Sequence, residues 1–259
     1  MRRFFLDSEI IHSDRPAITG PDVRHIRTVL RLKPGEEITL FDGEGSEYRA
    51  RITGSTPRAI TLSVLDRYPA ILEPAVQITI GQAILKAKKM DRIVRQLTEL
   101  GIFAFIPFIA ERSVPRPKPG PLAEKKQRWE AIAREALKQC GRSRIPHLGP
   151  MVPFKEVVGS GRSYDLKIIF HNRQCGDKPR HCLDAAQGVR KVLALIGPEG
   201  GFTDEEVKFA LDSGFAAICL GPRVLKSDTA SVAAGAILQY VFGDWVEPKK
   251  ILTTVRTPN

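Results

Sequence analysis

The chain has 259 residues, of which 42% are hydrophobic and 27% charged, and its formal net charge is +11. This balance excludes a disordered chain, and the length allows one or two globular domains. No apolar run approaches the roughly 20 residues that a membrane-spanning helix needs. The basic N-terminus lacks the long apolar stretch and the cleavage site of a signal peptide. We therefore expect an intracellular, cytoplasmic protein with no membrane partner.

The positive charge is concentrated in one part of the chain. Residues 86–95 contain five basic side chains and one acid, and residues 112–147 contain ten Lys or Arg against three Glu. A concentrated positive field attracts polyanions, because each neutralised phosphate releases condensed counterions. The pattern favours a nucleic-acid partner, and the alternative is a surface that is merely well solvated.

Residues 1–70 predict a small β-barrel domain. Turn signals separate short alternating segments, which we expect to be strands at residues 36–43, 47–54 and 58–65. A short helix is expected within residues 21–32, where apolar residues recur on one face and Arg24, Arg27 and Arg31 remain for the solvent. Prolines at positions 69 and 74 mark a linker.

Residues 75–246 predict an α/β domain, because strands and helices alternate there. We expect buried strands at residues 76–85, 103–109, 167–170, 192–197 and 216–221, forming a mostly parallel sheet. Amphipathic helices are expected at residues 89–101 and 124–141, with Met90, Ile93, Val94, Leu97 and Leu100 on the buried face of the first, and Trp129, Ile132, Ala133, Ala136, Leu137 and Cys140 on that of the second. Residues 247–259 predict a flexible tail.

A metal site is not expected. His171, Cys175, His181 and Cys182 are all donors that zinc accepts, but their spacing fits no standard zinc module. A polar loop explains the same residues equally well.

Two loops stand out as candidate ligand sites. The first lies within VLALIGPEGGFTDEEV (192–207), where closely spaced glycines come after a predicted strand. Glycines allow positive φ or a close approach of the backbone. A helix then begins at Thr203, with a capping box to Glu206. A second long loop lies within AAICLGPRVLKSDTASVAAGAILQYVF (216–242). Both follow predicted buried strands, where open α/β sheets bind ligands. The alternative for each loop alone is an ordinary turn. The sequence contains neither a P-loop nor a G-x-G-x-x-G motif between a strand and a helix.

The pair LIGPEGGFTDEE and LGPRVLKSDTA resembles the signature of the ribosomal RNA small-subunit methyltransferase E (RsmE) family, of the SPOUT superfamily. The resemblance extends over nearly the whole chain, since further matching segments occur in the family's order: MRRFFL, RHIRTVLRLKPGEEITLFDGEG, KAKKMDRIVRQLTELGI, PFIAERSV and QRWEAIAREALKQCGRSRIP.

This resemblance implies an α/β protein with an N-terminal PUA-like β-barrel and a C-terminal SPOUT α/β domain that contains a trefoil knot. It implies a homodimer that methylates N3 of a specific uridine in 16S rRNA, U1498 in the usual rRNA numbering, with S-adenosyl-L-methionine as cofactor. The cofactor-binding residues implied are Ile196, Gly197, Glu199, Gly200, Gly201, Leu220, Gly221, Val224, Leu225, Ser227, Thr229 and Ala230.

The chain departs mildly from the family pattern at two places. Lys226, Ser227 and Asp228 stand where the family often has Arg, Thr and Glu, and Cys140 stands where Ser is common. Lys cannot make the forked contacts of Arg, so the role of Lys226 stays open, and so does that of Cys140.

Methylation of uracil N3 requires loss of its proton and stabilisation of the anionic base. Arg142 and Arg223 are the candidates for that stabilisation, and Glu199 is a possible base or cofactor-orienting group. Phosphate contact remains the alternative for Arg142, and capping or an interface ion pair for Arg223. The basic residues expected to position RNA are Arg24, Arg27, Arg31, Lys86, Lys88, Arg112 and Arg128. Two rival functions are a SPOUT methyltransferase with another RNA target or position, and a non-catalytic ribosome-assembly factor that binds rRNA.

Overall fold

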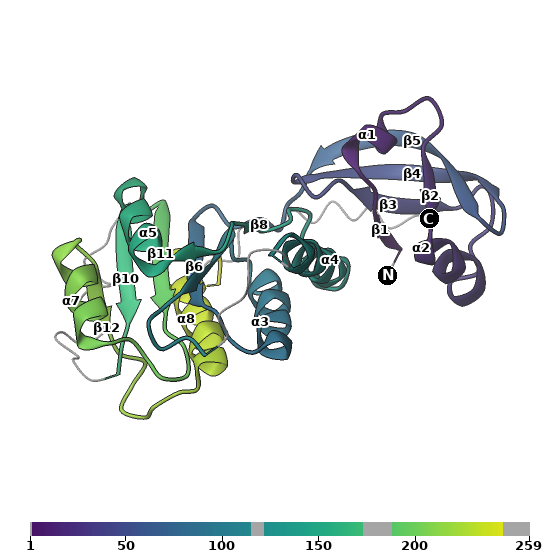
Figure 1. Cartoon of the computed structure of the whole chain (residues 1–259). Coiled ribbons are helices and arrows are strands. Elements are labelled where there is room, and N and C mark those ends of the chain that lie inside the picture. The colour runs from purple at the N-terminus through teal and green to yellow at the C-terminus, as the bar shows by residue number, and fades with distance from the viewer. Residues whose placement is uncertain (1, 115–121, 173–187, 246–259) are drawn as a thin grey trace. The chain divides into compact units, whose positions relative to one another are not determined.

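The structure is a computed structural model that describes residues 2–114, 122–172 and 188–245. The chain divides into two compact units, each built from several segments (Figure 1). Unit 1 comprises residues 1–73, 94–101 and 120–148, and unit 2 comprises residues 74–93, 102–119 and 149–259.

Unit 1 contains a five-stranded sheet in the order β1-β3-β4-β5-β2. Its strands are β1 (Arg3–Phe5), β2 (Ala17–Thr19), β3 (Glu37–Phe41), β4 (Ser46–Ser55) and β5 (Ala59–Pro69). β1 pairs with β3 in parallel and the other pairs are antiparallel. The register between β4 and β5 shifts twice, and such irregularities bend and twist a strand pair, as a half-barrel requires.

The helices of unit 1 include α1 (Ser8–Ile11), α2 (Pro21–Arg24), the π-helix η1 (His25–Val29) and α4 (Leu122–Cys140), which is followed by the short strand β8 (His147–Leu148). Val23 and Ile26 point from α2 and η1 into the core of the sheet, while Arg24 and Arg27 are exposed. Lys138 of α4 forms an ion pair of 2.9 Å with Asp22 of α2. The two helices are therefore joined by a polar contact within the unit.

Unit 2 is built on a parallel sheet in the order β12-β10-β11-β6-β7, with β9 parallel beside β7. The strands are β6 (Gln77–Ala83), β7 (Ala104–Ile109), β9 (Val152–Pro153), β10 (Leu166–Phe170), β11 (Lys191–Ile196) and β12 (Ala216–Ile218). Residues 192–196 of β11 are all buried, as expected for a central strand with both faces covered.

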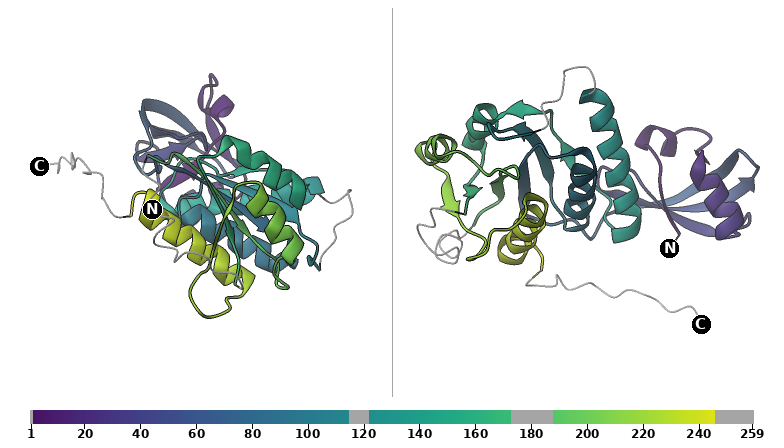
Figure 2. Two further views of the ribbon diagram at one scale, coloured as in Figure 1. Left: turned by 90° about the vertical axis from the view of Figure 1, so that its left-hand side faces the viewer. Right: turned by 60° about the horizontal axis from the view of Figure 1, so that its bottom comes forward.

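Helices cover both faces of this sheet (Figure 2). α5 (Phe154–Gly159), followed by the 3₁₀-helix η2 (Ser160–Ser163), and α7 (Asp204–Asp212) pack on one face around a core that includes Phe108, Leu193 and Phe202. On the other face α8 (Ser227–Phe242) packs against β6 and β11. The first half of α3 (Ala87–Glu99) belongs to unit 2 and its second half to unit 1.

The predicted fold class is confirmed: a PUA-like half-barrel sheet is followed by an α/β domain with a parallel sheet. The predicted helices correspond to α3 and α4, and most of their predicted inward residues are buried, whereas Leu100, Ile132 and Cys140 are only partly buried. The trefoil knot stays a prediction.

Three expectations were wrong in detail. The barrel sheet has five strands rather than three, since β1 and β2 are only three residues long and too short to show alternation. The strand expected at 216–221 ends at Ile218, because the chain leaves the sheet there for the second loop. The single helix expected within 21–32 is a turn of α-helix followed by a π-helix, and Arg31 beyond it has φ 54°. The predicted tail, residues 247–259, lies outside the described residues.

Candidate functional site

A pocket opens at the carboxyl ends of β10, β11 and β12 in unit 2. Its wall comes from the end of β10, the loop after β11 and the loop between β12 and α8. The lining residues are Phe170, His171, Asn172, Ile196, Gly197, Pro198, Glu199, Gly201, Phe202, Leu220, Gly221, Arg223, Val224, Leu225, Ser227 and Ala230. Open α/β sheets bind their ligands at this position.

The two predicted loops meet in this pocket. Ten of the twelve residues predicted to bind a cofactor line it: Ile196, Gly197, Glu199, Gly201, Leu220, Gly221, Val224, Leu225, Ser227 and Ala230. Gly200 and Thr229 lie in the same loops but are not among the lining residues. Pro198 and Phe202 lie within the predicted loop 192–207 but were not named as cofactor-binding residues. The sequence did not point to Phe170 or Asn172, because their contribution depends on how the strand ends come together.

The glycine loop after β11 is tightly constrained. Gly201 has φ 68°, which favours glycine, and a Cβ on Gly200 would lie 3.1 Å from the Cβ of Arg112. Arg112 also donates from Nη1 to the carbonyl oxygens of Gly200 and Phe202, at 3.1 and 3.3 Å. One arginine side chain therefore braces the loop that forms one wall of the pocket.

Glu206 holds the next part of the same loop. It completes the predicted capping box, since its backbone NH donates to Thr203 Oγ1 and its Oε2 accepts from the Thr203 NH at 3.0 Å. Its second oxygen, Oε1, accepts from the backbone NH of Glu111 at 2.9 Å. The carboxylate thus joins the start of α7 to the segment that follows β7, and it is 8% exposed.

Glu199 and Arg223 bring charge to the pocket. Lys89 of α3 donates to Glu199 Oε1 at 2.7 Å, and this hydrogen bond raises the pKa of the Lys89 ammonium above its ordinary value. Arg223 is exposed and lines the opposite loop. A carboxylate held by a lysine and an exposed guanidinium therefore face one cavity. Lys89 was missing from the predicted site residues, because nothing in the spacing of α3 relates it to Glu199.

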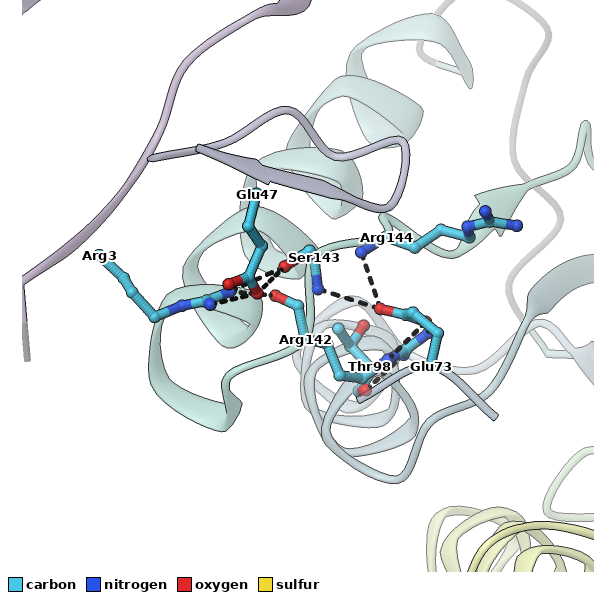
Figure 3. Close-up of polar contacts among 7 residues, drawn as sticks. All are labelled: Arg3, Glu47, Glu73, Thr98, Arg142, Ser143 and Arg144. Carbon is cyan, nitrogen blue, oxygen red and sulfur yellow. Dashed lines mark hydrogen bonds and ion pairs between the residues drawn. The ribbon is translucent and has the colours of Figure 1, made fainter. Parts of the chain in front are cut away.

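Arg142 is not among the residues that line the pocket, and it belongs to unit 1. Its guanidinium donates to Glu73 Oε2 at 2.8 Å and to the Thr98 carbonyl oxygen at 2.7 Å (Figure 3). Arg142 is 4% exposed, so these bonds are shielded from solvent. Nearby, burial raises the pKa of the Cys140 thiol, which lowers its reactivity.

The predicted RNA-positioning residues are all exposed: Arg24, Arg27 and Arg31 in unit 1 near α2 and η1, Arg128 on α4, and Lys86, Lys88 and Arg112 in unit 2. Lys226, whose role was left open, is exposed at the N-terminal boundary of α8 and makes no side-chain cap there.

Among the residues that the structure describes, no group of three or more His, Cys, Asp or Glu could hold a metal ion. Cys175, His181 and Cys182 of the weighed zinc set lie outside these residues. Within the same described part of the chain, no helix is both long enough and apolar enough to cross a membrane.

Known proteins resemble this chain over nearly its whole length. Residues 72–239 match the family model of an RNA methyltransferase domain, and residues 18–65 match that of an RNA methyltransferase PUA domain. Ribosomal RNA small subunit methyltransferase E of Aquifex aeolicus is 31% identical, over 84% of this chain and 90% of its own. The enzyme of that name from Bacillus subtilis is 27% identical, over 93% of this chain and 96% of its own.

The crystal structure of a ribosomal RNA small subunit methyltransferase E from Neisseria gonorrhoeae, bound to S-adenosyl methionine, is similar with a TM-score of 0.81 and 32% identity. The alignment covers 95% of this chain and 99% of that one. The two-unit architecture, the family models and these relatives agree, and the chain therefore belongs to the RsmE family of SPOUT RNA methyltransferases.

Proposed function

We propose that this protein transfers the methyl group of S-adenosyl-L-methionine to N3 of a specific uridine of 16S rRNA, U1498 in the usual rRNA numbering. The observation that carries the proposal is the pocket at the strand ends of unit 2, in which both predicted loops take part. Relatives that bear the name ribosomal RNA small subunit methyltransferase E support the choice of rRNA.

The pocket suits a nucleoside with a charged tail. Ile196, Leu220 and Leu225 offer apolar contacts for the faces of an adenine, and the glycine backbone leaves carbonyl and amide groups accessible for its edge. Glu199 offers a carboxylate for the ammonium or hydroxyl groups of such a ligand. The residues present therefore fit the cofactor that is bound in the structure from Neisseria gonorrhoeae.

The cofactor supplies an electrophilic methyl group, so the protein has to present N3 of the uracil and accept its proton. We assign Arg223 to the uracil oxygens, where a permanent positive charge stabilises the anionic base. Glu199, fixed by Lys89, is the candidate that accepts the N3 proton or orients the cofactor. Arg142 is the second candidate arginine for this role, and its guanidinium is bonded to Glu73 and to the Thr98 carbonyl oxygen in the structure.

RNA binding is assigned to residues 1–70, the PUA-like barrel, together with the basic residues of the methyltransferase domain at 75–246. The exposed Arg24, Arg27 and Arg31 support a phosphate-contacting role, because such contacts position the RNA without specifying a base. A target uracil in a duplex hides N3 in pairing, so the enzyme acts on an accessible or flipped nucleotide. An rRNA substrate assigns the reaction to the cytoplasm.

A homodimer is part of the proposal. The C-terminal part of α8 leaves Ile237, Tyr240 and Val241 between 38% and 61% exposed, and Trp245 just beyond it is 51% exposed. Contiguous apolar side chains of this kind are typical of protein interfaces. Tyr240→Lys should shift the mass measured by light scattering from dimer to monomer, whereas Lys208→Glu on α7 should not.

The reaction is tested by nucleoside mass spectrometry. Small subunits that lack the modification are incubated with the protein and S-adenosyl-L-methionine, and isolated 16S rRNA is assayed in parallel. We expect new 3-methyluridine at the proposed position. A methyl group elsewhere, such as a ribose 2′-oxygen, would favour another SPOUT activity. Tight subunit binding without transfer would favour the assembly factor.

Gly200→Val separates the enzyme from a pure RNA binder. The added side chain would collide with Arg112 and disturb the pocket wall, so we expect loss of methyl transfer with unchanged rRNA affinity. Gly159→Val is the matched control, since a Cβ at Gly159 would have no neighbour within 4 Å among the residues that the structure describes. Equal activity of the two variants would contradict a role of the glycine loop in the reaction.

A further inference from the structure

A network of three buried, hydrogen-bonded polar side chains lies behind the pocket wall. Gln82 of β6 is 0% exposed, and so is Ser231 of α8, while Ser227, which lines the pocket, is 5% exposed. Buried polar groups are costly unless their hydrogen bonds are satisfied, so these three residues require an explanation.

The hydrogen bonds of this network lead from Ser231 through Gln82 and Ser227 to Gly197. Ser231 Oγ shares its hydrogen between Gln82 Oε1 and the carbonyl oxygen of Ser227, the latter at 2.8 Å. Gln82 Nε2 donates to Ser227 Oγ at 3.0 Å. Ser227 Oγ then donates to the carbonyl oxygen of Gly197 at 2.5 Å. The second hydrogen of Gln82 Nε2 is used by the carbonyl oxygen of Ala83 at 2.9 Å, which fixes the orientation of the amide.

This arrangement joins the two loops of the pocket to the centre of the sheet. Gly197 belongs to the loop after β11 and Ser227 to the start of α8, and both line the pocket. Gln82 is fully buried and is not among the residues that line the pocket, yet its amide donates to the hydroxyl of Ser227, which does line it. A shift of this amide would change the position of both walls together.

We propose that Gln82 is a positioning residue for the cofactor: its side-chain amide orients Ser227 and, through it, holds the Gly197 carbonyl in the geometry that binds S-adenosyl-L-methionine. The inference rests on the proposed function and adds to it a residue outside the pocket. Only an amide supplies what this position needs, namely an acceptor toward Ser231 and a donor toward Ser227.

The experiment compares Gln82→Met and Gln82→Glu with the wild type in the full-length protein. Methionine keeps the length of the side chain but removes both hydrogen-bonding groups, and glutamate keeps the shape but replaces the donor by an acceptor. Calorimetry measures the dissociation constant of S-adenosyl-L-methionine, filter binding measures that of 16S rRNA, and thermal unfolding reports the folded fraction.

We expect both variants to bind S-adenosyl-L-methionine about tenfold more weakly, which corresponds to loss of roughly one hydrogen bond. Ser231→Ala removes the hydroxyl that faces Gln82 Oε1 and the Ser227 carbonyl oxygen but keeps the Gln82 donor to Ser227 Oγ, so it should have a smaller effect. The rRNA affinity should change less than about twofold, because phosphate contacts on the surface dominate that binding.

Thr79→Val is the matched control for mere destabilisation. Thr79 lies on the same strand, is 1% exposed, and accepts a hydrogen bond from Tyr164 rather than from a residue of the pocket. It should lower the midpoint of thermal unfolding without changing cofactor affinity. The inference is overturned if Gln82→Met binds the cofactor like the wild type, or if Thr79→Val weakens binding equally.

The same data separate this inference from the proposed function. If the wild type neither binds S-adenosyl-L-methionine nor methylates rRNA, the proposed function fails and takes the inference with it. If the wild type does both and the Gln82 variants bind the cofactor normally, only the inference fails. Should Gln82→Met not fold, Gln82→Glu gives the answer, since it keeps the shape of the side chain and removes only the amide donor toward Ser227.

Discussion

Arg142 and Glu73, which are 69 residues apart in the chain, form an ion pair with 2.8 Å between Nη2 and Oε2. The other carboxylate oxygen of Glu73 accepts from the backbone NH groups of Ser143 and Arg144, at 3.0 and 2.9 Å (Figure 3). Their side chains are only 5% and 16% exposed. The carboxylate of one residue in the linker segment therefore fixes three consecutive residues that follow α4.

Removing either partner of this pair should destabilise the protein. Glu73→Gln and Arg142→Met each leave one nearly buried charge unpaired, which typically costs about 3–5 kcal/mol. Urea unfolding followed by circular dichroism measures the change. Arg49→Met is the control, because the pair of Arg49 with Asp66 is more than half exposed, and it should leave the unfolding curve unchanged.

The same variants decide between a structural and a catalytic arginine. If Arg142 acts through its contacts with Glu73, then Glu73→Gln and Arg142→Met should reduce stability and methyl transfer in parallel. If Arg142→Met abolishes turnover while Glu73→Gln leaves it intact in the folded protein, the guanidinium acts on the substrate. Equal losses of turnover and of cofactor affinity in Arg142→Ala would also count against the catalytic role.

Loss of the Arg112 side chain should weaken the binding of the cofactor more than the binding of RNA. Its bonds to the carbonyl oxygens of Gly200 and Phe202 brace the pocket wall, so Arg112→Met should weaken S-adenosyl-L-methionine binding by roughly three- to tenfold. Arg92→Met removes an exposed arginine of α3 and serves as control. An Arg112→Met variant with normal cofactor binding and a smaller salt dependence of rRNA binding would instead identify a phosphate contact.

The carboxylate of Glu206 should stabilise unit 2 through the two hydrogen bonds that it accepts. Glu206→Ala removes the acceptor for the NH groups of Thr203 and Glu111, and each buried donor left unsatisfied costs about 1–3 kcal/mol. Glu205→Ala is the control, since Glu205 is exposed in the same turn of α7. The midpoints of thermal unfolding compare the two variants, and equal midpoints would show that the Glu206 carboxylate does not stabilise the fold.

Asp165 should stabilise the folded protein at neutral pH, and this stabilisation should be lost as the solution becomes acidic. Its Oδ2 accepts from the backbone NH groups of Arg190 and Lys191, and these bonds, that of Arg190 first, hold the pKa of Asp165 below its ordinary value of 3.8. A depressed pKa gives stability that is present above the unfolded value and lost as the pH falls through the folded one. The difference in unfolding midpoint between wild type and Asp165→Asn should therefore shrink below about pH 4. Parallel curves across the acidic range would contradict this.

The sequence predicted those parts of the fold that carry a local signal. The buried faces of α3 and α4 follow from helical spacing, and the two loops of the pocket from their glycines and the strands before them. Gln82 could not be found in this way, because one amide within an apolar strand has no periodicity, and its partners lie 145 and 149 residues further along the chain. The contact of Lys89 with Glu199 escaped prediction for the same reason.

The segmented make-up of unit 1 has a consequence for how the protein is made. Its last contributing segment ends at residue 148, after β6, β7 and the whole of α3 have already been synthesised. A nascent chain that has reached only residue 73 holds all five strands of the first sheet, yet the carboxylate of Glu73 has only water as a partner. Domains that are contiguous in sequence can fold one after another on the ribosome. Unit 1 is not contiguous, so we expect it to complete its fold only after its last segment has been synthesised. Protease resistance of stalled nascent chains should therefore rise only once residues 142–148 have emerged, when the first strands of the second sheet are already outside the ribosome.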